Sequence, residues 1–114
     1  MGVALERRGD LQRAITHYNR AIRLAPKNPR LYSNRAYAHF RTGDHQRAVE
    51  DCDHALELEP DLPMAYVNRG HARAAIGDHD RAAEDYRSAL DMGSAPDVAA
   101  EAERGLNAIG RDAE

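Results

Sequence analysis

Apolar side chains recur along the chain at the spacing of an α-helix. In the segment PRLYSNRAYAHFRTGD, the positions Leu31, Tyr32, Ala36 and Phe40 return about once per helical turn. Gly43 follows, and glycine adopts at little cost the left-handed conformation that commonly ends a helix. The pattern therefore predicts a helix that stops at Gly43.

A second helix is predicted immediately after this turn. The segment QRAVEDCDHALEL places Ala48, Cys52 and Ala55 on one face, and Pro60 prevents the helix from continuing. Asp44 precedes the segment, and we expect its carboxylate to accept hydrogen bonds from the free N–H groups that open this helix. The two segments together predict a helical hairpin.

The hairpin pattern occurs more than once. GDHQRAVEDC begins at Gly43, and GDHDRAAEDY begins thirty-four residues later at Gly77. The same shift aligns columns of similar residues: Gly9, Gly43 and Gly77; Ala14, Ala48 and Ala82; Ala21, Ala55 and Ala89; and Tyr18, Cys52 and Tyr86. Small side chains in fixed columns let helix backbones approach closely. We expect His45 and His79, a full period apart, to be solvent-exposed rather than to bind a metal.

The composition favours one all-α domain. Trp is absent and Phe occurs once, and 114 residues suffice for a single core. A net charge of -3 lacks the basic excess typical of nucleic-acid binding. The chain has no apolar run long enough for a bilayer, and the segment MGVALERRGD lacks the apolar core of a signal peptide, so we expect neither a nucleic-acid nor a membrane partner. The single Cys52 fits a cytoplasmic protein, and we expect this thiol to be buried and unreactive.

The period, the paired helices and the small-residue columns together resemble the tetratricopeptide repeat. The eighth position of that family, which holds a small residue, corresponds to Gly2, Ala36 and Gly70. The family's alanines at positions twenty and twenty-seven correspond to the columns that begin at Ala14 and Ala21. The resemblance implies an all-α, right-handed superhelix of antiparallel helix pairs in a single domain, 1–110. Its parts are a partial repeat at 1–28, repeats at 29–62 and 63–96, a capping helix at 97–110 and a frayed tail at 111–114. The stripe of Val98, Ala102, Leu106 and Ile109 suits such a capping helix.

Two positions depart from the usual residues of the family. The seventh position, commonly Leu, is Arg35 and Arg69, and the aromatic eleventh position is His39 and Arg73. We therefore expect the packing between helices to be more polar than usual.

The acidic and histidine side chains do not indicate an enzyme. Asp51 and Asp85 share a column, with Asp53 and His54 nearby, and this pattern is typical of a solvated convex face. General acid–base catalysis needs groups that converge in a water-restricted pocket, and here the repeat distributes them. The sequence also lacks a nucleophile elbow and a glycine-rich phosphate loop. We expect no catalytic residue, no cofactor and no metal site.

The resemblance implies a protein–protein interaction module, with a scaffold or adaptor role, that holds a partner peptide or helix in a concave groove. Carried over by position, the main groove residues are Arg30, Ser33, Asn34, Tyr37, Phe40, Arg41, Met64, Val67, Asn68 and His71. The further positions are Val3, Glu6, Arg7, Ala74, Ala75, Val98 and Glu101. Asn34 and Asn68 suit hydrogen bonds to a peptide backbone, and Tyr37 suits an apolar partner side chain. Tyr37 and Phe40 have an alternative role, which is packing between adjacent repeats. If His71 lines the groove, affinity should change between about pH 5 and 8.

Some members of the family bind the acidic C-terminus of heat-shock chaperones through a carboxylate clamp. The resemblance places the clamp cations at Met64, at Asn68 and before Met1, and its two asparagines at Val3 and Asn34, so only Asn34 matches. The charge-assisted hydrogen bonds of the clamp are therefore missing, and we expect no useful affinity for such a tail.

Self-association is the alternative function. A truncated first repeat should leave apolar surface near Ala14, Ile15, Tyr18 and Ile22 uncovered, and each such side chain forgoes about 1.5–3 kcal/mol. A second copy in a homo-oligomer, a swapped helix or an upstream part of a longer protein would each cover this surface.

Overall fold

Six helices joined by short turns make up the part of the chain that the structure describes. The structure is a computed structural model that describes residues 8–113. The helices are α1 (Arg8–Leu24), α2 (Pro29–Arg41), α3 (His45–Leu58), α4 (Pro63–Ile76), α5 (His79–Asp91) and α6 (Pro96–Ala113). Residues 8–113 contain no strand, so the predicted all-α fold is confirmed.

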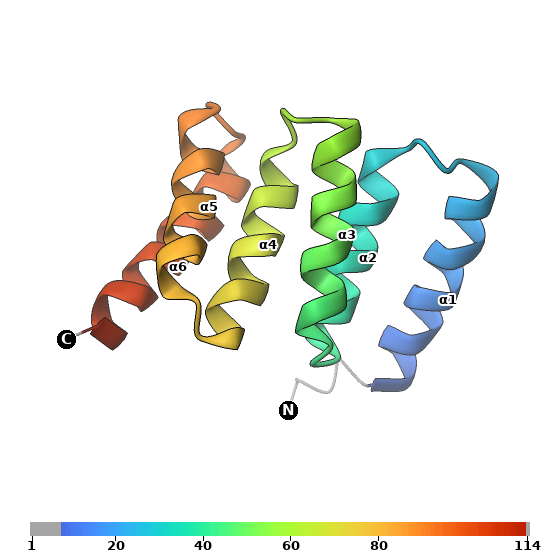
Figure 1. The fold of residues 1–114 in the computed structure, drawn as a ribbon, viewed down its shortest axis with the longest axis horizontal. Helices are drawn as coiled ribbons and strands as arrows, with labels where there is room; N and C mark the ends of the chain where they lie inside the picture. Colours follow the sequence, from blue (N-terminus) through green and yellow to red (C-terminus); the bar gives the residue numbers. More distant parts are fainter. Residues whose placement is uncertain (1–7, 114) are drawn as a thin grey trace.

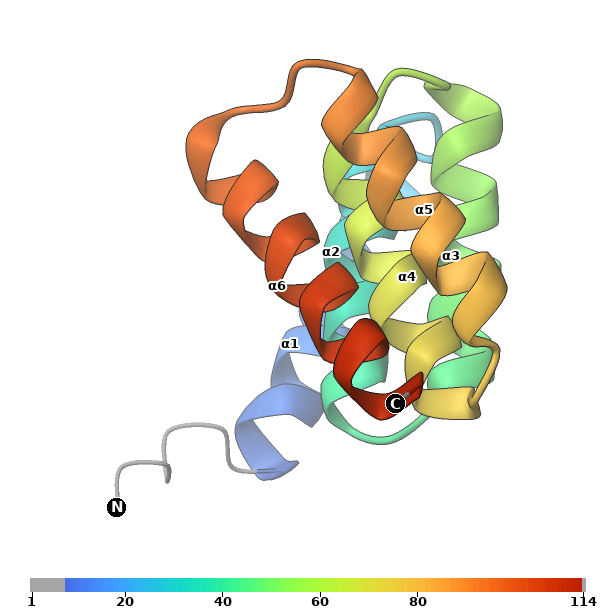
Figure 2. The same cartoon turned by 90° about the vertical axis from the view of Figure 1, so that its left-hand side faces the viewer.

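The helices stack as antiparallel neighbours along one direction (Figure 1). In the perpendicular view, α3 and α5 lie on one side, α2 and α4 lie beside them, and α6 runs diagonally on the opposite side (Figure 2). Helix α1 packs against α2, and α6 packs against both α4 and α5. Each helix thus contacts mainly its neighbours in sequence, which is the arrangement of a solenoid.

Glycine turns end α2 and α4, as the sequence predicts. Gly43 and Gly77 have φ angles of 89° and 101°, which non-glycine residues adopt only with strain. The N–H of Asp44 donates to the carbonyl of His39 at 2.8 Å, and the N–H of Asp78 donates to that of Arg73 at 2.9 Å. The predicted cap of the following helix is present only at Asp78, which accepts from the Arg81 N–H at 3.4 Å. The side chain of Asp44 makes no such bond, so that prediction is wrong.

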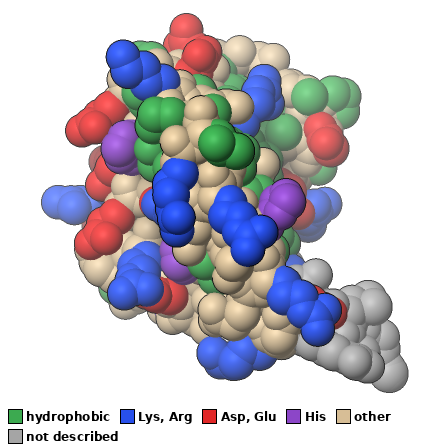
Figure 3. All heavy atoms as spheres, turned by 90° about the vertical axis from the view of Figure 1, so that its right-hand side faces the viewer, with side chains coloured by type: hydrophobic (Ala, Val, Ile, Leu, Met, Phe, Trp, Pro, Cys, Tyr) green, Lys and Arg blue, Asp and Glu red, His purple; other side chains and the backbone are tan. Residues whose placement is uncertain are grey.

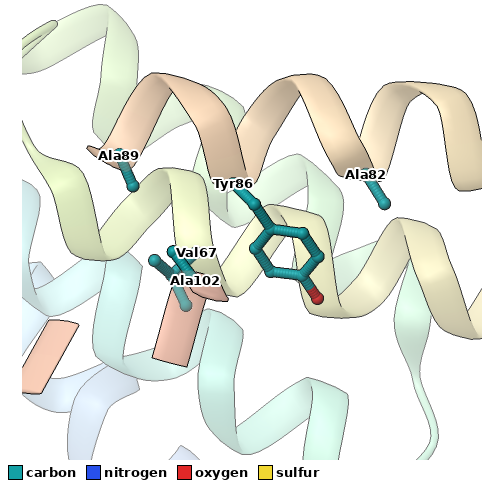
Figure 4. Close-up of a cluster of buried hydrophobic side chains, with 5 residues drawn as sticks. All are labelled: Val67, Ala82, Tyr86, Ala89 and Ala102. Atoms are coloured by element: carbon teal, nitrogen blue, oxygen red, sulfur yellow. The ribbon is translucent and has the colours of Figure 1, made fainter. Parts of the chain in front are cut away.

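The small-residue columns form the interior. Five alanines of these columns have no exposed surface, namely Ala36, Ala48, Ala55, Ala82 and Ala89. Tyr86 lies among Val67, Ala82, Ala89 and Ala102 (Figure 4). The capping stripe behaves as predicted, since Ala102 is buried and Val98, Leu106 and Ile109 pack against the same cluster.

Helix α6 approaches Tyr86 closely because a glycine faces the ring. A methyl group at Gly105 would overlap the Tyr86 ring, and one at Gly70 of α4 would stand 2.8 Å from the same ring. The tyrosine is therefore held between two side-chain-free positions. Both glycines are needed for the observed distance between the backbones of α4, α5 and α6.

The unusual arginines of α2 and α4 bind buried aspartates. Arg35 donates to both carboxylate oxygens of Asp51, at 2.8 and 2.7 Å, and to Asn19 of α1 at 2.9 Å. Asp51 is 7% exposed, and the Arg35–Asp51 bridge is bidentate. The pair therefore joins α2 to α3 while Asn19 joins both to α1.

The next repeat has the same connections thirty-four residues later. Arg69 donates to Asp85 at 2.9 Å and to Asp53 at 2.8 Å, and Arg73 donates to Asp85 at 2.9 Å. Asp85 is 3% exposed. The prediction that Asp51 and Asp85 lie on a solvated face is thus wrong, because arginines of the preceding helix replace water around their carboxylates.

The apolar surface predicted to be uncovered on the first repeat is largely covered. Ile15 is 9% exposed, and Ala14, Tyr18 and Ile22 are half-buried. Ile22 packs against the cluster formed around Tyr32 of α2. Packing of α1 on α2 is the physical reason, and it removes the apolar surface on which the self-association alternative depended.

None of the described helices is both long enough and apolar enough to cross a bilayer.

Candidate partner-binding surface

One exposed stripe follows the length of α2. It consists of Arg30, Asn34, Tyr37 and Arg41, whose spacing of four, three and four residues places them on one helix face. The Arg41 guanidinium donates to the Tyr37 hydroxyl at 2.8 Å and lies 5.7 Å from the centre of its ring. Tyr37 keeps 39% of its surface exposed. The stripe thus presents cations, an amide and an aromatic ring to solvent.

A hollow lies at the N-terminal end of this stripe. A cavity of about 270 Å³ is bounded by Arg30 of α2, Leu62 and Met64 at the start of α4, and Val98 of α6. A smaller hollow of about 90 Å³ shares Arg30, Leu62 and Met64 with it and extends to Asn34. The two adjoin each other, and their lining is mixed, since the larger one is also bordered by the carboxylates Glu59 and Asp61.

A second hollow lies at the C-terminal end of the stripe. Its volume is about 430 Å³, and its wall includes Phe40, His71, Ala74, Ala108 and Ile109. These residues come from α2, α4 and α6, the same three helices that bound the first hollow. Most of the wall is apolar, which suits an apolar side chain of a partner.

His71 joins the second hollow to the capping helix. Its Nδ1 lies 2.7 Å from the Tyr86 hydroxyl, and its Nε2 lies 2.9 Å from a carboxylate oxygen of Glu101. Because a carboxylate accepts only, Nε2 carries the proton, and Nδ1 of the neutral ring accepts from the Tyr86 O–H. Both ring nitrogens are thereby satisfied.

Burial governs the titration of these groups. Burial lowers the pKa of His71 below its usual value, and the hydrogen bond to Glu101 opposes this shift without reversing it. Burial also raises the pKa of the Tyr86 hydroxyl. His39, beneath the stripe, likewise has a pKa lowered by burial, against the opposing charge of Asp51. Burial therefore favours the neutral form of both His71 and His39 in the folded protein.

Three of the predicted groove residues lie beneath the surface. Val67 and Asn68 have exposed fractions of 0% and 1%, and Ser33 has 3%. The Asn68 amide donates to the carbonyl of Ser33 at 3.0 Å and lies 3.2 Å from its hydroxyl. This bond commits the Asn68 amide to joining α4 with α2, so the expected hydrogen bond from Asn68 to a partner backbone is not what the structure provides. The Oδ1 atom of Asn68 is buried without a partner among the described residues.

Phe40 combines the two roles that the sequence left open. It packs against the buried cluster that includes Ala36 and Ala72, and its ring stacks on His71 with 5.6 Å between centres. It also borders the second hollow. The centre of the His45 ring lies 5.5 Å from that of Phe40, and His45 is half-buried, so only His79 has the exposure predicted for both.

Sequence reasoning missed several residues of the two hollows. Leu62, Ala108 and Ile109 border them but were not predicted as contacts. Ala108 and Ile109 lie thirty-four residues after Ala74 and Ala75, so extending the period onto the capping helix would have identified both. The predicted positions Val3, Glu6 and Arg7 lie outside the described residues.

The described residues include no group of three or more histidine, cysteine, aspartate or glutamate side chains placed to hold a metal ion. Cys52 is buried, as predicted, and burial raises the pKa of its thiol.

Comparison with known families identifies the same repeat in three places. A family profile described as "TPR repeat" matches residues 2–43, and two described as "Tetratricopeptide repeat" match residues 29–62 and 65–92. No curated protein sequence matches the chain at a significant level.

Several solved structures are similar over most of the chain. The first TPR domain of human RPAP3 is 33% identical, with a TM-score of 0.81 over 90% of this chain and 79% of that one. The first TPR of Spaghetti (RPAP3), bound to the HSP90 peptide SRMEEVD, is 32% identical, with a TM-score of 0.81 over 91% and 80%. The TPR2B domain of yeast Sti1, in a pHsp70 complex, is 26% identical, with a TM-score of 0.83 over 91% and 86%.

Proposed function

Because the chain belongs to the tetratricopeptide repeat family, we propose that it is a protein-interaction module that holds a partner peptide on the face shared by α2, α4 and α6. One observation carries this proposal: the exposed stripe of α2 is flanked by a hollow at each end. The peptide complexes of Spaghetti and yeast Sti1 support the same kind of ligand. An adaptor role in the cytoplasm is the setting that we propose for it.

The dimensions of this face specify the ligand. Arg30 and Arg41 are eleven positions apart on α2, which corresponds to about 16 Å along a helix. An extended peptide covers this length with about five residues. We propose a segment with an apolar side chain near each end, one for the hollow beside Met64 and one for the hollow beside Phe40. Asn34 and Tyr37 lie between them and suit hydrogen bonds to the peptide backbone.

Affinity capture from lysate tests this proposal. The bait pair is the wild-type chain and the variant Asn34→Ala/Tyr37→Ala, in which only exposed side chains of α2 change. The matched control is Glu57→Ala/Arg87→Ala, which alters exposed side chains of α3 and α5. Proteins retained by wild type and control, and lost with the α2 variant, are the expected result. Equal retention by all three baits would contradict binding on this face.

The acidic chaperone tail is not the ligand that we propose. Met64 and Asn68 occupy positions where the resemblance places clamp cations, and Asn68 is buried. Without cations at these positions, the charge-assisted hydrogen bonds of the clamp cannot form there. Calorimetry with the peptide SRMEEVD should therefore give no measurable heat at micromolar concentrations. Submicromolar binding would overturn this prediction.

The described residues Ala14, Ile15, Tyr18 and Ile22 do not support the self-association alternative. Its apolar surface on α1 is covered, and the large apolar side chains that stay exposed are Leu24, Tyr37 and Ile76. These come from three different helices.

A further inference from the structure

The charge of the chain is distributed unevenly along the sequence. Residues 1–28 contain six Lys and Arg against two Asp and Glu, a net charge of +4. Residues 29–114 contain ten against seventeen, a net charge of -7, and the two values add to the overall -3. The overall charge therefore conceals a basic end, which includes the whole of α1.

Three basic side chains of α1 share one exposed face. Arg13, Arg20 and Arg23 are exposed, and Arg13 and Arg20 are seven residues apart, or about 10 Å along the helix. Thr16 and His17 lie between them, and these two residues line a shallow hollow of about 300 Å³ together with both arginines. Lys and Arg side chains follow one another down the face of the molecule on this side (Figure 3).

Most of this positive charge is not neutralised by the described residues. Arg13 pairs with Asp10 at 3.3 Å, whereas Arg20 and Arg23 form no ion pair within residues 8–113. The half-buried Arg35, Arg69 and Arg73, by contrast, all have aspartate partners. The basic face of α1 thus has charge available for an external anionic group.

An apolar side chain stands beside these cations. Leu24, at the C-terminal end of α1, is 88% exposed, the highest value among the exposed large apolar side chains. It follows Arg20 by four residues and therefore continues the same face of the helix. A partner that covers this face gains a contact with an apolar group as well as with cations.

We propose that the α1 face formed by Arg13, Arg20, Arg23 and Leu24 is a second docking surface, which binds an acidic amphipathic helix of a partner protein. A partner helix with acidic residues seven positions apart matches the spacing of Arg13 and Arg20, because both helices have the same rise per residue. An apolar residue on the same face covers Leu24. The exposed Leu24 beside the cations and the overall net charge of -3 favour a protein partner over nucleic acid. The surface is separate from the face of α2, α4 and α6.

The test uses two designed helical peptides of about 20 residues. One carries Glu at seven-residue spacing with a Leu on the same face, and the other carries Gln in place of each Glu. Fluorescence anisotropy measures binding of each to wild type, to Arg13→Glu/Arg20→Glu/Arg23→Glu, and to the matched control Arg47→Glu/Arg81→Glu/Arg87→Glu. The control reverses the same number of exposed arginines, on α3 and α5, so the net charge changes equally. Thermal melting verifies that each variant is folded. If the triple Arg→Glu variant of α1 is unfolded, the triple Arg→Gln variant at the same positions takes its place.

The proposal predicts that wild type and control bind the Glu peptide at least about tenfold more tightly than the α1 variant does. Affinity for the Glu peptide should fall between about 50 and 200 mM salt, and the Gln peptide should bind weakly at both. Equal weakening by both variants, or equal affinity for both peptides, would overturn it. Tighter binding of duplex DNA than of the Glu peptide would instead identify a phosphate-binding face. A salt-sensitive dimer that the α1 variant abolishes would identify a second copy as the occupant.

Discussion

Among single residues, Asp85 carries the greatest number of polar connections in the core. It accepts hydrogen bonds from Arg69 and Arg73, and its side chain is 4% exposed. Asp53 accepts from the same Arg69 at 2.8 Å, but its side chain is 50% exposed. Both carboxylates pair with Arg69, but only Asp85 is buried. Comparing variants of the two therefore shows how much burial of the ion pair contributes to stability.

Removing Asp85 should cost far more stability than removing Asp53. Asp85→Ala removes the buried carboxylate that the half-buried Arg69 and Arg73 share, and the free energy of unfolding should fall by about 3 kcal/mol. Asp53→Ala removes a solvent-exposed partner and should cost less than about 1 kcal/mol. Urea denaturation measures both values. Similar losses for the two variants would show that the buried network does not hold α4 to α5.

The titration of His71 gives a second prediction at this scale. Its pKa is lowered in the folded protein, so its contribution to stability is complete above the unfolded pKa of about 6.5 and is lost as the pH falls below that value. His39 acts in the same direction. The melting temperature should therefore decrease from pH 7 to pH 5.5, above the titration of most carboxylates.

NMR titration of the His71 ring measures the shift directly, and a pKa at or above 6.5 would contradict it. His71→Gln should flatten the dependence of the melting temperature on pH. The exposed His79 offers the matched variant, since His79→Gln should leave that dependence unchanged.

Among the elements, the helices themselves follow directly from the sequence, whereas the partners of their polar side chains do not. The alanine columns and glycine turns fix helix positions locally, since each acts within its own turn or at one contact. Whether Asp51 is buried or solvated depends on Arg35, which lies sixteen residues earlier on another helix. A buried ion-pair column and a solvated acidic face have the same pattern within one helix, and only the matching arginine column sixteen residues earlier distinguishes them.

The predicted site was limited for a related reason. Positions transferred from the family identified the exposed stripe of α2, but they could not specify how deeply each side chain lies. The Asn68 amide could bind a ligand or a neighbouring helix equally well. Because the Ser33 carbonyl lies within hydrogen-bond distance, the amide binds the neighbouring helix. Burial of this kind depends on the spacing between helices, which a single sequence does not give.

The docking of α6 depends on the absence of a side chain at one position. Gly105→Ala introduces a methyl group that overlaps the Tyr86 ring, and we expect a loss of about 1–3 kcal/mol as α6 shifts outward. Gly110→Ala, in the same helix but with nothing within 4 Å, should be neutral or stabilising by up to about 1 kcal/mol. Thermal unfolding followed by circular dichroism compares the two. Equal effects would show that Tyr86 does not fix the position of α6.

For the whole molecule, the helices separate two surfaces of different chemistry. The face of α2, α4 and α6 combines a hollow of mixed lining beside Met64 and a mainly apolar hollow beside Phe40 with a polar stripe, and the outer face of α1 is basic. A partner segment that needs apolar anchors and one that carries acidic residues would therefore meet different parts of the solenoid. This separation is what an adaptor requires in order to hold two partners at once.

Binding on the face of α2, α4 and α6 can be tested by mapping where a selected peptide binds. Peptides selected on the wild-type chain from a random displayed library would be titrated into isotopically labelled protein, with NMR chemical shifts recorded for each residue. We predict that the largest changes fall on Asn34 and Tyr37 of α2, Met64 of α4 and Val98 of α6. Largest changes on the exposed residues of α3 and α5 would contradict it.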